Sequence, residues 1–213
     1  MSGSIIGHNA LDRLLDQRPD LWRGDRQRRR DALATGSALL DGALPDGGWP
    51  RGRLVELRLE RLGLGELELL LPMLATQTRQ GRPIALIAPP LVPCPQRLAS
   101  AGMDLTRLLV VRPGKHAAWV AEQCLKSALF AALVLWLPTR QCDERQFRRL
   151  QLAAETGEAP LFVCQASTAP VTTSAMLRLQ LHAGGEVEIL RGRLGARATR
   201  LRPTAGNIVP LRA

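Results

Sequence analysis

A short glycine-rich turn, followed by an amphipathic helix, is the part of this sequence where chemistry is first expected. It reads Gly63-Leu-Gly65-Glu66-Leu67 and follows the predicted strand 53–58. Such a turn binds phosphate when it has the form G-x-x-x-x-G-K-[ST]. Its backbone N–H groups then surround the phosphates, its lysine neutralises their charge, and its hydroxyl holds Mg²⁺. Gly65 can stand for the second glycine of that pattern.

The other positions of the phosphate-binding pattern carry unsuitable groups. Glu66 replaces the lysine, Leu67 replaces the Ser/Thr, and the first glycine has no counterpart at the right spacing. A carboxylate that faces a triphosphate in a partly desolvated loop costs on the order of several kcal/mol. Two interpretations of Gly63 and Gly65 stay open: a tight strand-to-helix turn, or residual anion binding at the helix N-terminus.

The elements that position this turn alternate between strand and helix. Besides 53–58, apolar strands are predicted at 84–88, 108–112, 131–137 and 161–165. Helices are predicted at 66–79, 94–101, 117–127 and 143–155, with a short one starting in 35–41. This alternation predicts an α/β fold with a mostly parallel sheet flanked by helices. Pro72 should kink the helix 66–79 or reset its start.

The two ends of the chain differ from the alternating part, 32–202. Residues 1–31 predict an amphipathic helix at 9–17 and then a basic arm dense in arginine. Residues 176–182 and 186–190 alternate around Gly184-Gly185, which predicts an antiparallel C-terminal hairpin on the sheet edge. Residues 203–213 form a tail with little periodicity.

The positive charge suggests an anionic partner. The net charge is +10, with 29 Lys and Arg residues against 19 Asp and Glu. Arginine binds phosphate bidentately, so DNA contact through phosphates is one interpretation. A solvated face, or the arginine bias of a GC-rich coding sequence, is the other. The candidate contacts to DNA or a partner are Arg148, Arg149, Arg178, Arg191, Arg193, Arg197, Arg200, Arg202 and, as an aromatic anchor, Trp22.

Several function classes are not expected. The four cysteines and three histidines are widely spaced, so no metal site, catalytic triad or cofactor is predicted. The longest apolar run, 127–137, is too short for a bilayer, which takes about 20 residues. The N-terminus lacks the pattern of a signal peptide. We therefore expect a cytoplasmic protein without membrane contact.

The stretch from Ala34 to Leu57 resembles the entry to the RecA core. In that family a "TG…LD…G-G-x-P-x-G" turn leads into the first core strand and the phosphate-binding loop. The resemblance extends to about residue 200. It is closer to the ImuA group, whose motifs appear in order as Gly47–Gly52, Gly63–Leu67, Ala85–Pro90, Leu135–Leu137 and Arg148–Glu155.

The resemblance also indicates which catalytic groups are missing. RecA proteins end the fourth core strand with an acidic residue for magnesium (Walker B), where this chain has Trp136 and Leu137. They place a water-activating glutamate after the second strand, where this chain has Pro89 and Pro90. With Glu66, these replacements predict a protein that does not hydrolyse ATP and does not use it as a cofactor.

The resemblance implies a function in DNA damage and repair, in SOS mutagenesis by translesion synthesis. ImuA proteins act beside ImuB, a polymerase-like partner, and an error-prone DnaE-type polymerase. This chain is then a non-enzymatic adaptor for them. Two alternatives are a regulator that docks on RecA or its filament, and a cell-division inhibitor of the SulA type.

Overall fold

The alternating part of the sequence is the part whose structure can be described. The computed structural model describes residues 32–60, 65–137, 143–171, 174–183, 185–191 and 199–201. Contacts divide the chain into the units Met1–Arg30 and Asp31–Ala213, and all described residues belong to the second. The predicted helix 9–17, the basic arm and the tail 203–213 therefore lie outside the described residues.

The strands and helices follow the predicted order closely. The strands are β1 (Ala32–Leu33), β2 (Trp49–Pro50), β3 (Leu54–Leu59), β4 (Ile84–Ile87), β5 (Leu108–Val111), β6 (Ala132–Trp136), β7 (Leu161–Ala166), β8 (Leu177–Leu181), β9 (Val187–Arg191) and β10 (Thr199–Leu201). The α-helices are α2 (Ala38–Ala43), α3 (Glu66–Arg79), α4 (Pro95–Ser100), α5 (Ala117–Lys126) and α6 (Glu144–Gly157). Short 3₁₀ turns lie at Leu105–Arg107 and Gly114–His116.

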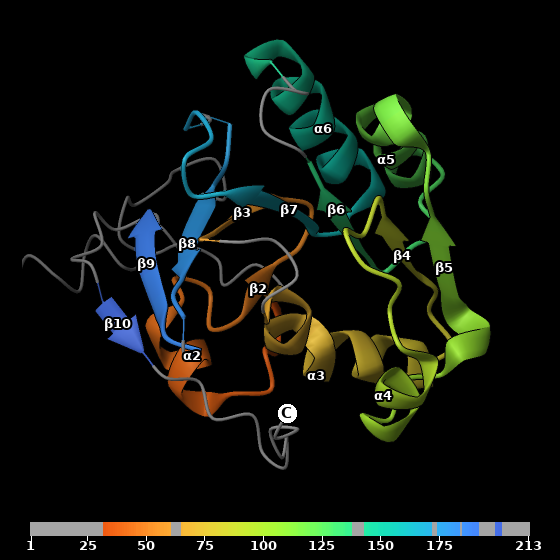
Figure 1. Cartoon of the computed structure of the whole chain (residues 1–213), viewed down its shortest axis with the longest axis horizontal. Coiled ribbons are helices and arrows are strands. Elements are labelled where there is room, and N and C mark those ends of the chain that lie inside the picture. Colours follow the sequence, from red (N-terminus) through yellow and green to blue (C-terminus); the bar gives the residue numbers. More distant parts are fainter. Residues whose placement is uncertain are drawn as a thin grey trace, which may run out of the picture. The chain divides into compact units, whose positions relative to one another are not determined.

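The main sheet confirms the predicted fold class. Its order is β10-β9-β8-β3-β7-β6-β4-β5 (Figure 1). The strands from β8 to β5 pair in parallel, while β9 pairs antiparallel with both β8 and β10. The predicted C-terminal hairpin is thus present, and β8 joins the sheet beside β3.

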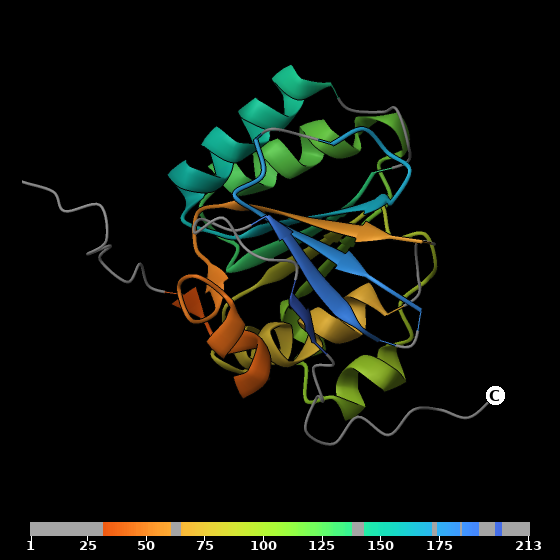
Figure 2. The ribbon, with the colours of Figure 1, turned by 90° about the vertical axis from the view of Figure 1, so that its left-hand side faces the viewer.

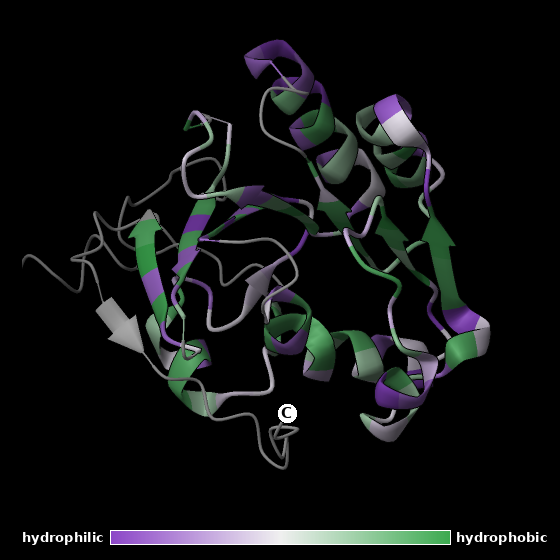
Figure 3. Cartoon of the chain, viewed as in Figure 1, coloured by the Kyte–Doolittle hydropathy of each residue, from purple (hydrophilic) through white to green (hydrophobic). Residues whose placement is uncertain are grey.

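Helices cover both faces of the sheet (Figure 2). On one face, α5 and α6 pack through Leu125, Phe147 and Leu150 against apolar side chains of the central strands. On the other, α2, α3 and α4 form a second apolar cluster with β3, β8 and β9. Figure 3 shows β4 and β6 as continuously apolar, as expected for strands buried on both faces. Along β8, polar and apolar residues alternate.

Two expectations about local structure were wrong or incomplete. Helix α3 begins at Glu66, six residues before Pro72, so the proline does not reset its start. Pro72 has no N–H to donate within the helix, and Thr76 Oγ1 donates to its carbonyl oxygen at 2.9 Å. The turn expected at Gly47–Gly52 contains the short strand β2, which pairs with β1. The strands β1, β2 and β10 were not predicted from the sequence.

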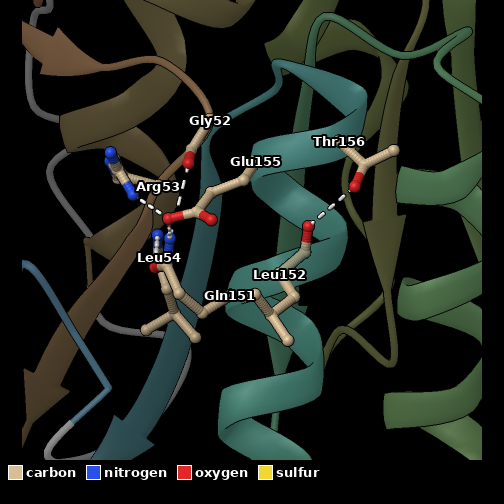
Figure 4. Close-up of polar contacts among 7 residues, drawn as sticks. All are labelled: Gly52, Arg53, Leu54, Gln151, Leu152, Glu155 and Thr156. Carbon is tan, nitrogen blue, oxygen red and sulfur yellow. Dashed lines mark hydrogen bonds and ion pairs between the residues drawn. The ribbon is translucent and has the colours of Figure 1, made fainter.

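Two motifs of the predicted resemblance, Gly47–Gly52 and Arg148–Glu155, meet at the start of β3 (Figure 4). Gln151 Oε1 accepts from the Leu54 N–H at 2.8 Å, and Glu155 pairs with Arg53. Gly52 has a φ of +62°, and a Cβ there would lie 3.4 Å from the Ala154 carbonyl oxygen. The end of the glycine turn 47–52 is therefore held against helix α6. This contact gives the residues of both motifs a structural role.

Candidate functional site

The turn into α3 confirms a structural use for one of its two glycines. Gly65 is the N-cap of α3 with a φ of +103°, a conformation that favours glycine. Its carbonyl oxygen accepts from the Leu69 N–H at 3.0 Å, which starts the helix. Gly63 lies outside the described residues. Glu66 is consequently the first residue of α3, where the helix dipole favours a carboxylate.

Glu66 and Trp136 form a buried contact. The Trp136 indole Nε1 donates to Glu66 Oε1 at 2.7 Å, and the two residues are 3% and 1% exposed. These are the positions predicted for the magnesium-binding acid and the phosphate-binding lysine. They come from β6 and α3, 70 residues apart in the chain, so the structure brings the two predicted positions together.

A pocket of about 230 Å³ opens beside this hydrogen bond at the carboxyl ends of β4 and β6. Open α/β sheets bind ligands in the crevice at the carboxyl ends of their strands. Pro89 and Pro90, the third predicted replacement, also line the pocket. The full lining is Gly65, Glu66, Leu67, Glu68, Pro89, Pro90, Leu91, Val92, Pro93 and Trp136. All three replacements therefore lie at one site.

Strain in the backbone marks the entry of this pocket. Ala88, directly before Pro89, has a φ of +55°. This left-handed conformation is unfavourable for a residue with a Cβ, and a following proline favours extended conformations instead. The Ala88 N–H donates to the Val111 carbonyl oxygen at 2.8 Å, which helps to hold it. Strained residues cluster at functional sites.

The electrostatics of the pocket oppose an anion. The charged residues in the described lining are Glu66 and Glu68, and Glu68 pairs with Arg97 of α4 at 3.1 Å. Beneath the site, burial and the nearby Glu66 carboxylate raise the pKa of the Cys164 thiol well above its usual range. The thiol stays protonated and unreactive at neutral pH.

One of the predicted arginine contacts lies inside the protein. Arg178 is 8% exposed, and its Nε donates to Glu56 Oε2 at 2.7 Å. Arg178 was predicted as a contact to DNA or a partner, which the buried ion pair contradicts. Burial was missed because Glu56 and Arg178 face each other only through the parallel β3–β8 register.

The other predicted contacts are only partly described. Arg148 and Arg149 are exposed on α6, and Arg149 Nη2 donates to Glu122 Oε2 of α5 at 2.7 Å. Trp22, Arg193, Arg197 and Arg202 lie outside the described residues, as do the side chains of Arg191 and Arg200. Within the described ranges, no group of three His, Cys, Asp or Glu residues is arranged to hold a metal.

Two features near these sites were not predicted from the sequence. Leu91 and Val92 are large, exposed side chains on the pocket rim, and their signal was their place between Pro90 and Pro93. Arg58 is buried beside Glu56, which no spacing rule indicates. The helices in the described part of the chain are too short or too polar to span a membrane.

Comparison with known proteins agrees with this fold. RecA of Acholeplasma laidlawii is 33% identical over 107 residues, which cover 49% of this chain and 32% of that protein. RecA of Prochlorococcus marinus (strain MIT 9211) is 34% identical over 115 residues, covering 53% and 31%. The matched part is thus about a third of the length of these RecA proteins. The chain is a RecA-like protein.

The family can be stated more narrowly. The model of the family described as the MT3502 N-terminal domain matches residues 42–169. This match covers more than half of the chain and spans β3 to β7 with the whole pocket. The chain belongs to the MT3502 N-terminal domain family.

Proposed function

We propose that this chain is a non-enzymatic RecA-like accessory protein that works by binding other proteins. The hydrogen bond between Trp136 and Glu66 is the observation on which this rests. Phosphoryl transfer needs a cation on the phosphates and oxygen ligands for Mg²⁺. Here the two positions hold a carboxylate and an indole that are hydrogen-bonded to each other. Pro89 and Pro90 offer no base for a water molecule.

The process that we propose is SOS-induced mutagenic translesion DNA synthesis. The resemblance of the motifs to the ImuA group supports it, and the similarity to RecA supports a repair function more broadly. The chain would then connect an ImuB-type polymerase-like protein with an error-prone DnaE-type polymerase. DNA would be contacted through phosphates by exposed arginines such as Arg148, with a steep salt dependence.

Direct binding to the ImuB-type protein tests this proposal. The purified full chain and a variant without residues 1–30 are titrated with that protein, with and without single-stranded DNA, at two salt concentrations. We expect saturable binding by the full chain, with a salt dependence that steepens when DNA is present. An absence of binding at both salt concentrations contradicts the adaptor role.

A second candidate is a regulator that docks on RecA itself. The identity of about a third to RecA over half of the chain favours it, because a related fold offers related surfaces. It predicts direct binding to RecA when no polymerase is present. Binding of RecA without binding of the ImuB-type protein would select this candidate over the first.

A further inference from the structure

The loop that leaves β4 presents two large apolar side chains at the mouth of the pocket. Leu91 is 66% exposed and Val92 is 72% exposed, and both line the pocket. Isolated apolar residues on a surface are ordinary, but these two adjoin the apolar lining of Leu67 and Trp136. Exposed apolar side chains that continue an apolar pocket lining form a surface on which a partner's apolar side chain can pack.

The backbone of this loop is restricted before any partner binds. Pro89, Pro90 and Pro93 each fix their backbone φ, and the strained Ala88 is hydrogen-bonded to β5. Ordering a loop on binding normally costs free energy. Because the 89–93 loop is already restricted, that cost is small, as in a surface preorganised for recognition.

The size of the pocket indicates what it takes. Small-molecule sites usually have volumes of roughly 300–1,000 Å³, and this pocket has about 230 Å³. A pocket of this size, open at one side and bordered by Leu91 and Val92, suits one bulky apolar side chain of a polypeptide. Interface hot spots are of this kind: a buried apolar anchor in a well-formed pocket.

The charges at the pocket indicate which type of residue lies beside that apolar side chain in the partner segment. The charged residues of the described lining are both carboxylates, and the Glu68 side chain is 57% exposed. The chain as a whole carries a net charge of +10. The net positive charge repels a cationic partner segment, and Glu68 is the exposed carboxylate of the lining with which such a segment can pair once it replaces Arg97.

We infer that this pocket docks a segment of a partner protein in which a bulky apolar side chain adjoins a lysine or arginine. The apolar side chain enters between Leu67, Trp136 and the 89–93 loop, and the cation reaches Glu68, in exchange with Arg97. This inference rests on the proposed adaptor function, because it gives that function its contact surface. The former nucleotide site becomes the partner site.

A double variant on the rim tests the contact. L91D/V92D places carboxylates where the apolar anchor would pack, and both positions are exposed enough for the fold to be kept. L152D is the matched control, since Leu152 is 55% exposed on α6, away from the pocket. The purified ImuB-type protein is the probe. We expect L91D/V92D to weaken its binding by about tenfold or more, and L152D to leave it unchanged.

Overlapping synthetic peptides of the ImuB-type protein test the chemistry of the segment. Peptides with an apolar residue beside Lys or Arg should bind the wild-type chain. They should bind E68Q more weakly, and R97Q more tightly, than they bind the wild-type chain. Equal binding of the protein by L91D/V92D and wild type overturns the pocket inference alone. A preference for acidic peptides overturns it as well. If the wild-type chain binds no ImuB-type protein, the adaptor function itself fails.

Discussion

Two regions of the sheet differ in where they hold charged side chains. At the carboxyl ends of β4 and β6, an open and largely apolar pocket stands where a nucleotide site would carry its charged groups. Between β3 and β8, in contrast, three charged side chains are buried together. Glu56 is fully buried and accepts from Arg58 at 2.8 Å and from Arg178 at 2.7 Å.

The buried charged side chains stabilise the structure around them. Arg58 also donates to the carbonyl oxygens of Ser167 and Ala169, and so ties the β7–β8 connection to the sheet. Charges that satisfy one another inside the protein hold a loop in place, whereas an open apolar pocket has binding capacity left for a partner.

The largest effect is expected from removing the carboxylate of the buried network. In Glu56→Ala, two buried guanidinium groups lose their counter-charge, which typically destabilises a protein by about 3–5 kcal/mol. Urea unfolding monitored by circular dichroism measures the loss. Glu68→Ala, which breaks the exposed pair with Arg97, is the control and should cost about 1 kcal/mol or less. Equal losses in both would remove the contrast between the two regions.

A smaller effect is expected at the pocket. Trp136→Phe keeps most of the apolar volume and removes the indole donor to Glu66. Loss of one partner from a buried hydrogen bond costs about 1–3 kcal/mol. Thermal unfolding measures this, with Trp119→Phe as control because Trp119 is 59% exposed. If both variants unfold alike, the contact between Glu66 and Trp136 does not organise the site.

The same two regions show how far the sequence could predict the molecule. The bounds of α3 and the continuously apolar β4 follow from local periodicity, and both were predicted closely. Glu66 and Trp136 were identified singly as replacements. That they bond to each other, and that Arg178 is buried on Glu56, depends on strand order and register across long stretches of chain. Local patterns hold no information on such pairing.

Relief of the backbone strain at Ala88 tests whether the 89–93 loop takes part in partner binding. Ala88→Gly removes the Cβ from a positive-φ position and should stabilise the fold by up to about 1 kcal/mol. It should also loosen the 89–93 loop and weaken partner binding. Ala128 has the same φ of +55° at the end of α5, so Ala128→Gly should bring a similar stability gain without weakening binding. Chemical denaturation and a partner titration separate these outcomes.

The smallest effect concerns acid stability on the helical layer. Burial raises the pKa of Glu122, but hydrogen bonds from Lys126 and Arg149 outweigh burial, so that its pKa is lowered. A carboxyl with a lowered pKa stabilises the fold above its unfolded pKa, and this contribution is lost as the pH falls through its folded pKa. Glu122→Gln should therefore flatten the acid limb of a stability–pH profile. An unchanged limb would contradict this.

Titration of MgATP into the purified chain is the most direct test of the central claim. Calorimetry up to millimolar nucleotide, beside full-length RecA under the same conditions, measures binding, and phosphate release measures turnover. A pocket with Glu66 and Trp136 at the positions of the lysine and the acid predicts neither binding nor release for this chain. Micromolar, Mg²⁺-dependent affinity for ATP, with release of phosphate, would contradict the account.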